Sequence, residues 1–503
     1  LWVGHHGNTP SLYLNNTDGT FTDISRRVVP KDALADGHGV AWGDFDNDGD
    51  QDLIELVGAE RGKGAGPNHL FVNEDGKLVN KAFELNVDYP LGSGRTPLWL
   101  DADRDGWLDL IVVNRPRPDR KAPSTLFRQI RKSFQESNHL FGFRVEKPSR
   151  FDKVFDLIAN LKRLRFRKPR YLWRPVDFAQ LADISGDRIL DLVVYSRPMR
   201  IYSLATVPFK DITVATGLPM VPQAKDAAIE DFNGDGRLDF FFAQAPYIVV
   251  AAEQVRPSEV RGRFLSSKDS SPTIQFTTGG EVSFEVFPPW VVSEITDGST
   301  TWKTYDTSFS LSLNTKAREF MTSKSLEGVL SIQLSSDGLV SVTNKSSTLA
   351  CFIATSTTPI YHLQTVNSKP ADVENTQMLV LQQSDGGFMA RPLPLRLETH
   401  PGCHSVAAGD FDNDMDVDVY LVAKGLVINA PNILLENDGN GNFVAVSNAG
   451  GAAGSHIGLG DVVVTTDYDR DGFLDLFITN GAWPTLLVKN GPHQLFHNEG
   501  NAN

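Results

Sequence analysis

A nine-residue pattern that recurs six times constrains the fold of this chain more than any other feature of its sequence. Each copy has an acidic, amide or hydroxyl side chain at positions 1, 3 and 5, and Asp at position 9. Recurrence of one pattern is typical of architectures built from repeated units. We therefore expect the chain to stack several copies of one small unit. The copies begin at Asp44, Asp101, Asp183, Asp231, Asp410 and Asp467.

The sequence on both sides of each copy predicts β-strands. A short apolar segment precedes the pattern, as at residues 40–42, and a run rich in β-branched and aromatic residues follows it, as at residues 53–57. These runs are too short for helices and have the composition of strands. The pattern is therefore expected to form a loop between two strands, here called the Asp loop.

A second, weaker motif of the form Leu-x-x-Asn-x-x-Gly follows downstream. A strand, a turn rich in Asn, Asp and Gly, and another strand predict a β-hairpin. One repeat then consists of a strand, an Asp loop, a strand, a connection, a strand, a turn and a strand. Four antiparallel strands of this kind make one blade of a β-propeller. The motif occurs at residues 12–21, 70–76, 379–388, 434–439 and 495–500.

The number and spacing of the motifs predict an all-β, seven-bladed β-propeller with two insertions. Six blades carry an Asp loop, and residues 1–25 resemble a seventh blade without its first strand and loop. The loops at Asp231 and Asp410 begin 179 residues apart, against 57 for Asp44 and Asp101, so one blade holds a large insertion. Its alternating, Ser- and Thr-rich segments predict a small β-sandwich. The expected organisation is propeller over residues 1–249, an inserted β-rich domain over 250–374 and propeller over 375–503, with a short helical, basic insertion at about 145–175.

The Asp loops have the composition of calcium sites. Ca²⁺ takes about six to eight oxygen ligands, which the side chains at positions 1, 3, 5 and 9 and the backbone carbonyl of position 7 could supply. Clustered carboxylates repel one another unless a cation neutralises them, so we expect about four to six bound calcium ions. The candidate ligands are Asp44, Asp46, Asp48, Asp50 and Asp52 in the first loop; Asp101, Asp103, Asp105, Trp107 and Asp109 in the second; Asp183, Ser185, Asp187, Ile189 and Asp191 in the third; Asp231, Asn233, Asp235, Arg237 and Asp239 in the fourth; Asp410, Asp412, Asp414, Asp416 and Asp418 in the fifth; and Asp467, Asp469, Asp471, Phe473 and Asp475 in the sixth.

The six loops are not equivalent. The third has Ser185 at position 3 and Arg188 at position 6, where Gly is expected to permit the turn, so we expect it to bind calcium most weakly or not at all. The fifth has Met415 at position 6 but keeps five Asp residues. The first loop also fits the EF-hand pattern, because Glu55 stands at position 12. The other loops have apolar residues there and all six have predicted strands on both sides, which opposes that alternative.

Composition limits the partners of the chain. The 62 Asp and Glu residues exceed the 48 Lys and Arg residues, and a net charge of −14 argues against nucleic acid as a partner. No apolar run is long enough to predict a transmembrane segment. The first residue is Leu, so the chain looks processed or incomplete at its N-terminus. Two cysteines, Cys351 and Cys403, do not make a disulfide scaffold, and the sequence leaves open whether they are bridged.

The Asp loop and the hairpin motif together resemble the FG-GAP/VCBS repeat of integrin α-subunit propellers and of many secreted bacterial proteins. They look closest to the propellers of the ASPIC/UnbV type, which are cartilage acidic protein-like. The resemblance covers roughly residues 1–145, 175–250 and 375–503. It implies calcium-stabilised extracellular recognition or adhesion, with ligands at positions 1, 3, 5, 7 and 9 of each loop. Some fungal lectins with a similar architecture bind sugars between blades, so fold alone does not decide the function.

The predicted function is therefore that of an extracellular scaffold, secreted or at the cell surface, for adhesion, assembly or protein binding. Its expected partner is another protein or a second copy of the chain, and a calcium-dependent lectin that binds glycans is the alternative. An enzyme is not expected, because the sequence has no nucleophile elbow, HExxH motif or phosphate-binding Gly loop. Calcium already accounts for the repeated Asp residues.

Overall fold

The computed structural model of the chain describes residues 1–31, 33, 35–58, 66–115, 122–138, 178–195, 199–218, 224–244, 250–264, 272–287, 291–296, 299–304, 308–311, 318–323, 328–335, 337–344, 350–366, 378–393, 403–423, 430–454, 460–480 and 492–500.

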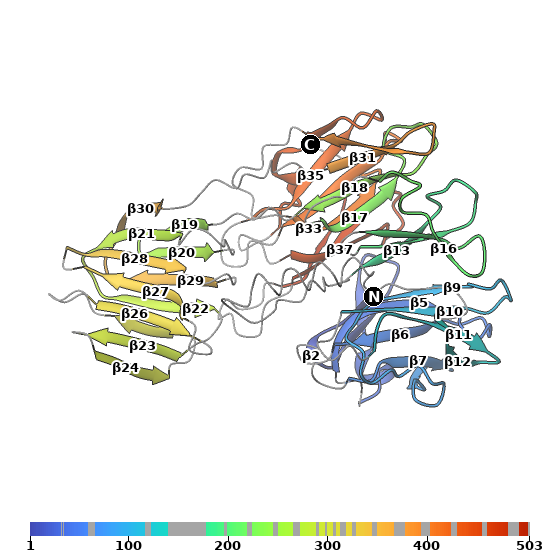
Figure 1. The fold of residues 1–503 in the computed structure, drawn as a ribbon, viewed down its shortest axis with the longest axis horizontal. Helices are drawn as coiled ribbons and strands as arrows, with labels where there is room; N and C mark the ends of the chain where they lie inside the picture. Colours follow the sequence, from blue (N-terminus) through green and yellow to red (C-terminus); the bar gives the residue numbers. More distant parts are fainter. Residues whose placement is uncertain are drawn as a thin grey trace, which may run out of the picture. The chain divides into compact units, whose positions relative to one another are not determined.

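Strands make up nearly all of the regular structure in these residues (Figure 1). The described helices are one turn of α-helix, α1 (Ser25–Val28), and one 3-10 segment (Ser447–Gly451). Neither of them is long and apolar enough to cross a membrane. The all-β class is therefore confirmed, whereas closure of the sheets into a seven-bladed propeller stays a prediction.

The first compact unit of the chain, Leu1–Met220 with Gln382–Met389, holds four antiparallel sheets. Three of them correspond to the predicted repeats that begin with the first three Asp loops, and the fourth precedes them in the chain. In order across each sheet, the strands are β1 (Trp2–Val3), β3 (Ser11–Asn15) and β4 (Phe21–Asp23); β2 (His6–Asn8), β5 (Ala35–Gly43), β6 (Asp52–Val57), β7 (His69–Glu74) and β8 (Lys77–Asn80); β9 (Gly94–Leu100), β10 (Asp109–Asn114), β11 (Thr125–Ile130) and β12 (Ser133–Glu136); and β13 (Ala179–Ala182), β14 (Asp191–Val194), β15 (Arg200–Ser203) and β16 (Lys210–Asp211).

The second compact unit, Val221–Leu381 with Ala390–Asn503, holds three sheets of the same kind and two larger ones. We call the seven sheets of this kind in the two units the repeat sheets. In the second unit the repeat sheets consist of β17 (Ala224–Glu230), β18 (Asp239–Gln244), β31 (Met378–Gln382) and β32 (Phe388–Pro392); β33 (Cys403–Gly409), β34 (Asp418–Ala423), β35 (Ile433–Asn437) and β36 (Phe443–Ala445); and β37 (Gly460–Thr466), β38 (Asp475–Asn480) and β39 (Gln494–Phe496).

Within each unit, repeat sheets that follow one another in the chain pack face to face. In the first unit, Leu56 of β6 shares a hydrophobic core with Val112 of β10. In the second unit, Tyr420 of β34 shares one with Ile478 of β38. A strand covered on both faces is apolar throughout and does not alternate. This explains why every residue of β6, β10 and β34, the strands that follow Asp loops, is buried.

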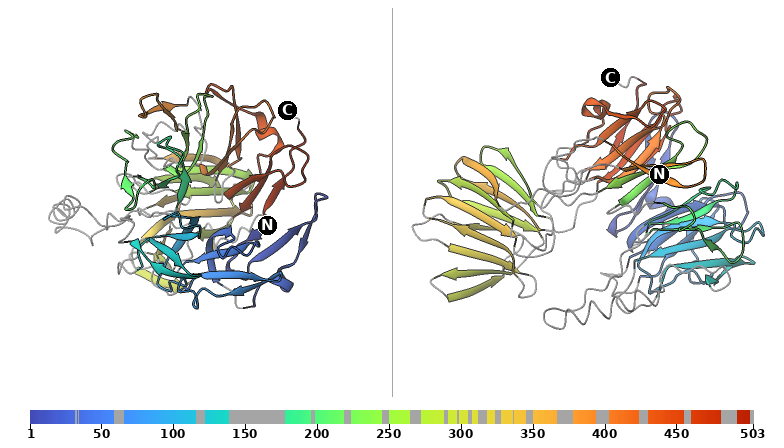
Figure 2. Two further views of the ribbon diagram at one scale, coloured as in Figure 1. Left: turned by 90° about the vertical axis from the view of Figure 1, so that its right-hand side faces the viewer. Right: turned by 45° about the horizontal axis from the view of Figure 1, so that its top comes forward.

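The chain forms a two-sheet β-sandwich between β18 and β31, and Figure 2 shows its strands in green to yellow. The two sheets are antiparallel, and their facing sides share a core that includes Phe276, Phe284, Ile332 and Phe352. The first sheet has the order β19 (Val250–Arg256), β20 (Glu259–Phe264), β29 (Ala350–Ser356), β22 (Val282–Phe287) and β25 (Ser308–Leu311). The second has the order β24 (Ser299–Thr304), β23 (Val291–Thr296), β26 (Arg318–Ser323), β27 (Gly328–Leu334), β28 (Leu339–Asn344), β21 (Thr273–Thr278) and β30 (Ile360–Val366).

The sandwich interrupts a repeat sheet without breaking it. β18 pairs antiparallel with β31, with Phe240 opposite Val380, in the same way that β34 pairs with β35 in the next repeat sheet. The predicted helical insertion at about 145–175 lies within residues 139–177, which are outside the described part of the chain.

The two cysteines are not bridged. Cys351 lies in the sandwich and Cys403 in a repeat sheet, and both are free and buried. Burial raises the pKa of each thiol to about 12, so neither ionises at neutral pH. The question that the sequence left open is thus answered in favour of two structural thiols.

Candidate metal centres

The six Asp loops share one backbone frame, in which the first Asp of the loop closes the turn. In the first loop, the carboxylate of Asp44 accepts hydrogen bonds from the backbone N–H groups of Asp48 and Gly49, both at 3.1 Å. The equivalent pair, at 2.7–3.1 Å, recurs in the loops that begin at Asp101, Asp183, Asp231, Asp410 and Asp467. The recurrence of these bonds confirms that the nine-residue pattern is a single structural element.

The frame requires two residues with positive φ, at positions 4 and 6 of each loop. Gly49, Gly106, Gly236 and Gly472 supply position 6 in four loops, with φ between 81° and 96°. Arg188 and Met415 take the same conformation in the other two, at φ 67° and 76°. A side chain is disfavoured there because Cβ approaches the following carbonyl. The sequence therefore located the loops correctly even where the expected Gly is replaced.

Replacing Met415 by Gly is expected to stabilise the protein. The Met415 side chain is 93% exposed and therefore contributes little packing. Relief of its backbone strain outweighs the larger entropy of Gly in the unfolded chain, for a net gain of roughly 0.5–1 kcal/mol. Thermal unfolding of the variant measures the gain. The matched control is Gly472→Ala at the same position of the sixth loop, where φ is 95° and a loss of similar size is expected. An unchanged or lower melting temperature for Met415→Gly would contradict the strain argument.

The Asp at position 9 of each loop is buried, and in the first, second, fifth and sixth loops it accepts a hydrogen bond from a backbone N–H in the third strand of its sheet or just after it. In the fifth loop, Asp418 accepts hydrogen bonds from the backbone N–H groups of Phe411 at 3.1 Å and of Asn437 at 2.9 Å. Burial raises the pKa of Asp418 to about 7, although these bonds oppose the rise. The same cause raises the pKa of Asp109 to about 7 and that of Asp52 to about 6. Such carboxyl groups gain from a nearby cation that favours their ionised form.

Several carboxylate oxygens of the loops face inward without a hydrogen-bond partner in the described structure. They include one oxygen each of Asp46 in the first loop, Asp103 in the second and Asp416 in the fifth. Carboxylate oxygens are the ligands that Ca²⁺ prefers, and these oxygens therefore fit a hard cation.

Four of the loops also bring enough acidic side chains together for one ion. In each group the ligand atoms lie within 4.8 Å of one another. The third and fourth loops form no such group among the described residues, since position 3 is Ser185 or Asn233. The role of the position 7 carbonyl stays a prediction. The groups are Asp44, Asp46 and Asp48; Asp101, Asp103 and Asp105; Asp410, Asp412 and Asp418; Asp467, Asp469 and Asp475; and Asp469, Asp471 and His497.

The sequence analysis missed a set of side-chain amides that join consecutive repeat sheets. The side chain of Asn437 donates hydrogen bonds to the carbonyl of Val417 in its own loop and to that of Phe232 in the preceding repeat sheet, at 3.0 and 2.9 Å. Asn498 donates to Phe411 in the same way, at 2.7 Å. Gln129 has the equivalent bond to Phe45 in the first unit. The recurring Asn of the hairpin motif is the sequence signal for these bonds, since Asn437 and Asn498 both stand at that position.

The EF-hand alternative for the first loop is wrong. Strands β5 and β6 flank this loop, and Glu55 of β6 is buried beside His69 of β7, with its carboxylate 2.9 Å from the imidazole Nδ1. Glu55 therefore has a partner inside the sheet, at the place where an EF-hand would need a calcium ligand.

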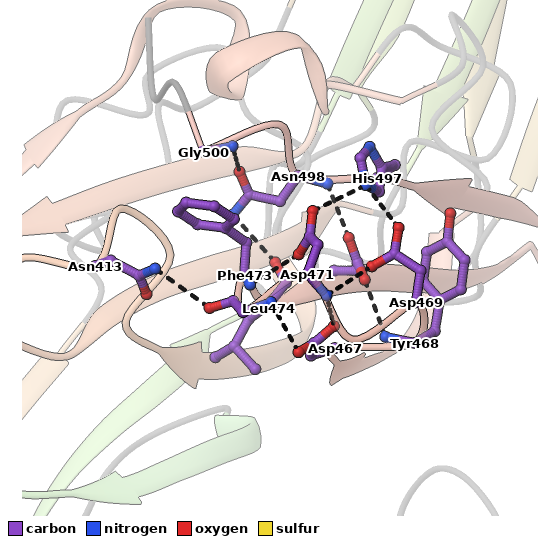
Figure 3. Close-up of polar contacts among 12 residues, drawn as sticks. Asn413, Asp467, Tyr468, Asp469, Asp471, Phe473, Leu474, His497, Asn498 and Gly500 are labelled. Carbon is purple, nitrogen blue, oxygen red and sulfur yellow. Dashed lines mark hydrogen bonds and ion pairs between the residues drawn. The ribbon is translucent and has the colours of Figure 1, made fainter. Parts of the chain in front are cut away.

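The sixth loop differs from the others in having an imidazole among its carboxylates (Figure 3). His497 follows β39, and its Nε2 lies 2.8 Å from Asp469 and 3.2 Å from Asp471. Loop six is joined to loop five by a hydrogen bond from the Asn413 side chain to the Gly472 carbonyl, at 3.2 Å. The sequence analysis did not include His497, because it counted ligands only within the nine-residue pattern.

Comparison with known proteins supports the resemblance of this chain to the FG-GAP repeat. Residues 1–55 match the family model described as FG-GAP-like repeat. Over 108 residues the chain is 32% identical to cartilage acidic protein 1 of Xenopus tropicalis, and this stretch is 20% of the chain and 14% of that protein. The match thus spans only a small part of the relative's length.

Similarity to solved structures is weak. The biofilm matrix protein Bap1 of V. cholerae shares 11% identity and a TM-score of 0.26, with 91% of this chain and 86% of that chain covered. The GH32 β-fructofuranosidase BmSUC1 of Bombyx mori shares 11% identity and a TM-score of 0.20, with 70% and 73% covered. Neither score supports a shared fold or function.

Proposed function

Residues 1–55 match the FG-GAP-like repeat, and from this premise we propose that the chain is a calcium-stabilised, seven-bladed β-propeller that serves as an extracellular scaffold for adhesion, assembly or protein binding. The observation that carries the proposal is the shared loop frame with unpartnered carboxylate oxygens. Asp416 supports it best, because one of its oxygens is buried without a hydrogen-bond donor, and burial together with the neighbouring carboxylates raises its pKa to about 6.

Calcium would stabilise the folded conformation of these loops and would not take part in a reaction. Asp44, Asp46 and Asp48 would hold an ion at the first loop, and its positive charge would offset the repulsion between their carboxylates. The Asp residue at position 9 already fixes the loop to the next strands, so cation binding would rigidify the edge of each repeat sheet. We propose a role in binding and not in catalysis, because the clustered acids are accounted for by this structural task.

The extracellular location is proposed on the same grounds. The ligand groups lie in loops with exposed members such as Asp48, Asp105 and Asp414, which suits binding at the higher calcium concentrations outside cells. Extracellular modules bind calcium with dissociation constants of about 10⁻⁴–10⁻³ M. Repeat families of this type typically serve adhesion or protein binding.

Calcium stoichiometry measured by native mass spectrometry tests the proposal. We expect about four to six calcium ions per chain, because six loops have the frame and two of them have fewer carboxylates. The double variant Asp414→Asn/Asp416→Asn should lose one ion, whereas Asp385→Asn, in an exposed turn outside the Asp loops, should lose none. A chain without bound calcium at millimolar concentration would contradict the proposal.

The partner class can be decided with the same calcium-loaded protein. We expect it to bind a protein partner or itself, which light scattering and capture on immobilised protein would detect. Calcium-dependent retention on immobilised glycans, reversed by the free sugar, would instead favour the lectin alternative.

A further inference from the structure

One position of the repeat sheet places a side chain next to the Asp loop of the same sheet in the second and sixth repeats. It is the residue just before the one whose backbone N–H binds the position 9 Asp, and we call it the pre-anchor position. In the second repeat this residue is Arg128, because the N–H of Gln129 binds Asp109 at 2.7 Å. In the sixth it is His497, because the N–H of Asn498 binds Asp475 at 2.8 Å.

Arg128 shows where a side chain at the pre-anchor position reaches. Its guanidinium contacts the carboxylate of Asp103 and lies 3.5 Å from that of Asp105. These are positions 3 and 5 of the second loop, where a cation would be held. A side chain at the pre-anchor position of this repeat therefore reaches the carboxylates of the Asp loop in its own sheet.

His497 reaches the same two positions of the sixth loop. Its Nε2 is 2.8 Å from Oδ2 of Asp469 and 3.2 Å from Oδ2 of Asp471, as Figure 3 shows. Asp467 and Asp475 also lie close to Asp469, and the carboxylate ligand atoms of these three residues are within 4.8 Å of one another. An imidazole nitrogen and carboxylate oxygens thus converge on one small volume.

The backbone that carries His497 is held firmly in place. The side chain of the next residue, Asn498, donates hydrogen bonds to the carbonyls of Phe411 at 2.7 Å and of Leu474 at 3.2 Å. The ring of Tyr468 lies edge-on to the imidazole, with 6.2 Å between ring centres. A ligand held by its surroundings needs little reorganisation when an ion binds.

We propose that the sixth Asp loop takes Zn²⁺ or a similar borderline divalent cation, with His497, Asp469 and Asp471 as ligands. Imidazole suits zinc, copper and nickel, whereas calcium takes oxygen ligands, so this loop differs in preference from the all-oxygen loops. Zinc ligands stand about 2.0–2.2 Å from the ion, which separates neighbouring ligand atoms by about 3.3 Å in a tetrahedral site. The distance between His497 and Asp471 already has this size, and that between His497 and Asp469 needs about half an ångström more.

This inference rests on the proposed ability of the Asp loops to hold a divalent cation. It is tested by titrating the full chain, saturated with calcium at neutral pH, with zinc chloride in a calorimeter, and by the visible absorption of bound Co²⁺. We expect one zinc ion per chain and a cobalt spectrum with nitrogen ligation. Replacing His497 by Val, the residue that precedes Asn73 in the first repeat, should weaken zinc binding more than about 100-fold and leave calcium binding intact. The variant His497→Gln is a second test that keeps a polar side chain.

Two further variants make the test specific to the pre-anchor position. Arg128→His places an imidazole at the same position of the second loop and should add a second zinc site. His404→Val is the control, since His404 also lies beside an Asp, Asp461, at 3.4 Å but outside any Asp loop, and its loss should leave zinc binding unchanged.

The outcomes separate this inference from the calcium proposal. Zinc binding that persists in His497→Val would overturn the inference. So would a chain that binds no zinc but gains one calcium ion in His497→Val, because His497 would then be an internal cation like Arg128. A single His497-dependent zinc ion on a chain that binds no calcium would uphold the inference and overturn the proposed calcium binding instead.

Discussion

Replacing Asp418 by Ala should lower the free energy of unfolding by roughly 2–5 kcal/mol, because it leaves two buried backbone N–H groups without an acceptor. The donors are the N–H groups of Phe411, in the loop, and of Asn437, at the end of β35. The side chain is 1% exposed, so water cannot replace the lost bonds without opening the sheet. Chemical denaturation of the variant and the wild type measures the difference.

Measurement with and without a chelator separates the structural role of Asp418 from metal binding. The two backbone bonds need no cation, so most of the loss should persist in excess EDTA. The control is Asp385→Ala, which removes one exposed bond to the N–H of Gly387 and should cost no more than about 1 kcal/mol. Equal stability of Asp418→Ala and the wild type in EDTA would show that the position 9 Asp serves only the cation.

Removal of calcium should lower the melting temperature strongly at pH 7.5 and only slightly near pH 4.5. The pKa of Asp109 and of Asp418 is raised by burial from 3.8 to about 7 in the folded protein without a cation. The folded state then binds protons that the unfolded chain has released. The stability that these groups contribute is full below about pH 4 and is lost as the pH rises through about 7.

A bound cation reverses this dependence because it requires the ionised carboxylates. Saturation at a hundredfold excess over the dissociation constant contributes about 2.7 kcal/mol per site, and protons compete with it as the pH falls. We therefore expect the stability of the calcium-loaded protein to rise between pH 4.5 and 7.5 and that of the chelated protein to fall. Melting curves at several pH values, with calcium or with EDTA, measure both trends. Parallel trends in the two conditions would contradict the assignment of these acids to cation sites.

The parts of the fold that the sequence predicted are those determined by neighbouring residues. The strand after each Asp loop could be recognised because the position 9 Asp is followed by a run that is mostly apolar, as in β6, β10 and β34. The loops could be recognised even with Met415 at position 6, because their hydrogen bonds join residues only four or five positions apart. Both patterns lie within a short window of sequence.

The parts that could not be predicted depend on contacts between distant segments. The amide of Asn437 bonds to Phe232 across 205 residues, and no local pattern indicates that partner. Arg128 and His497 approach the loops from the following strands, so their proximity depends on strand register and not on spacing within the loop.

The sandwich has a consequence for how such a chain could arise and vary. Its first and last strands lie side by side, because the Gln254 side chain of β19 donates a hydrogen bond to the carbonyl of Ile360 in β30 at 3.0 Å. Its host strands β18 and β31 are also direct neighbours. A domain whose ends leave from adjacent strands can be exchanged for a tight turn, or for another domain, without moving the host. In that case the repeat sheets would be the ancestral part of the chain, and residues 250–366 would be a domain that can be replaced. New binding specificity could then evolve in this domain, while selection on the Asp loops would act on stability alone.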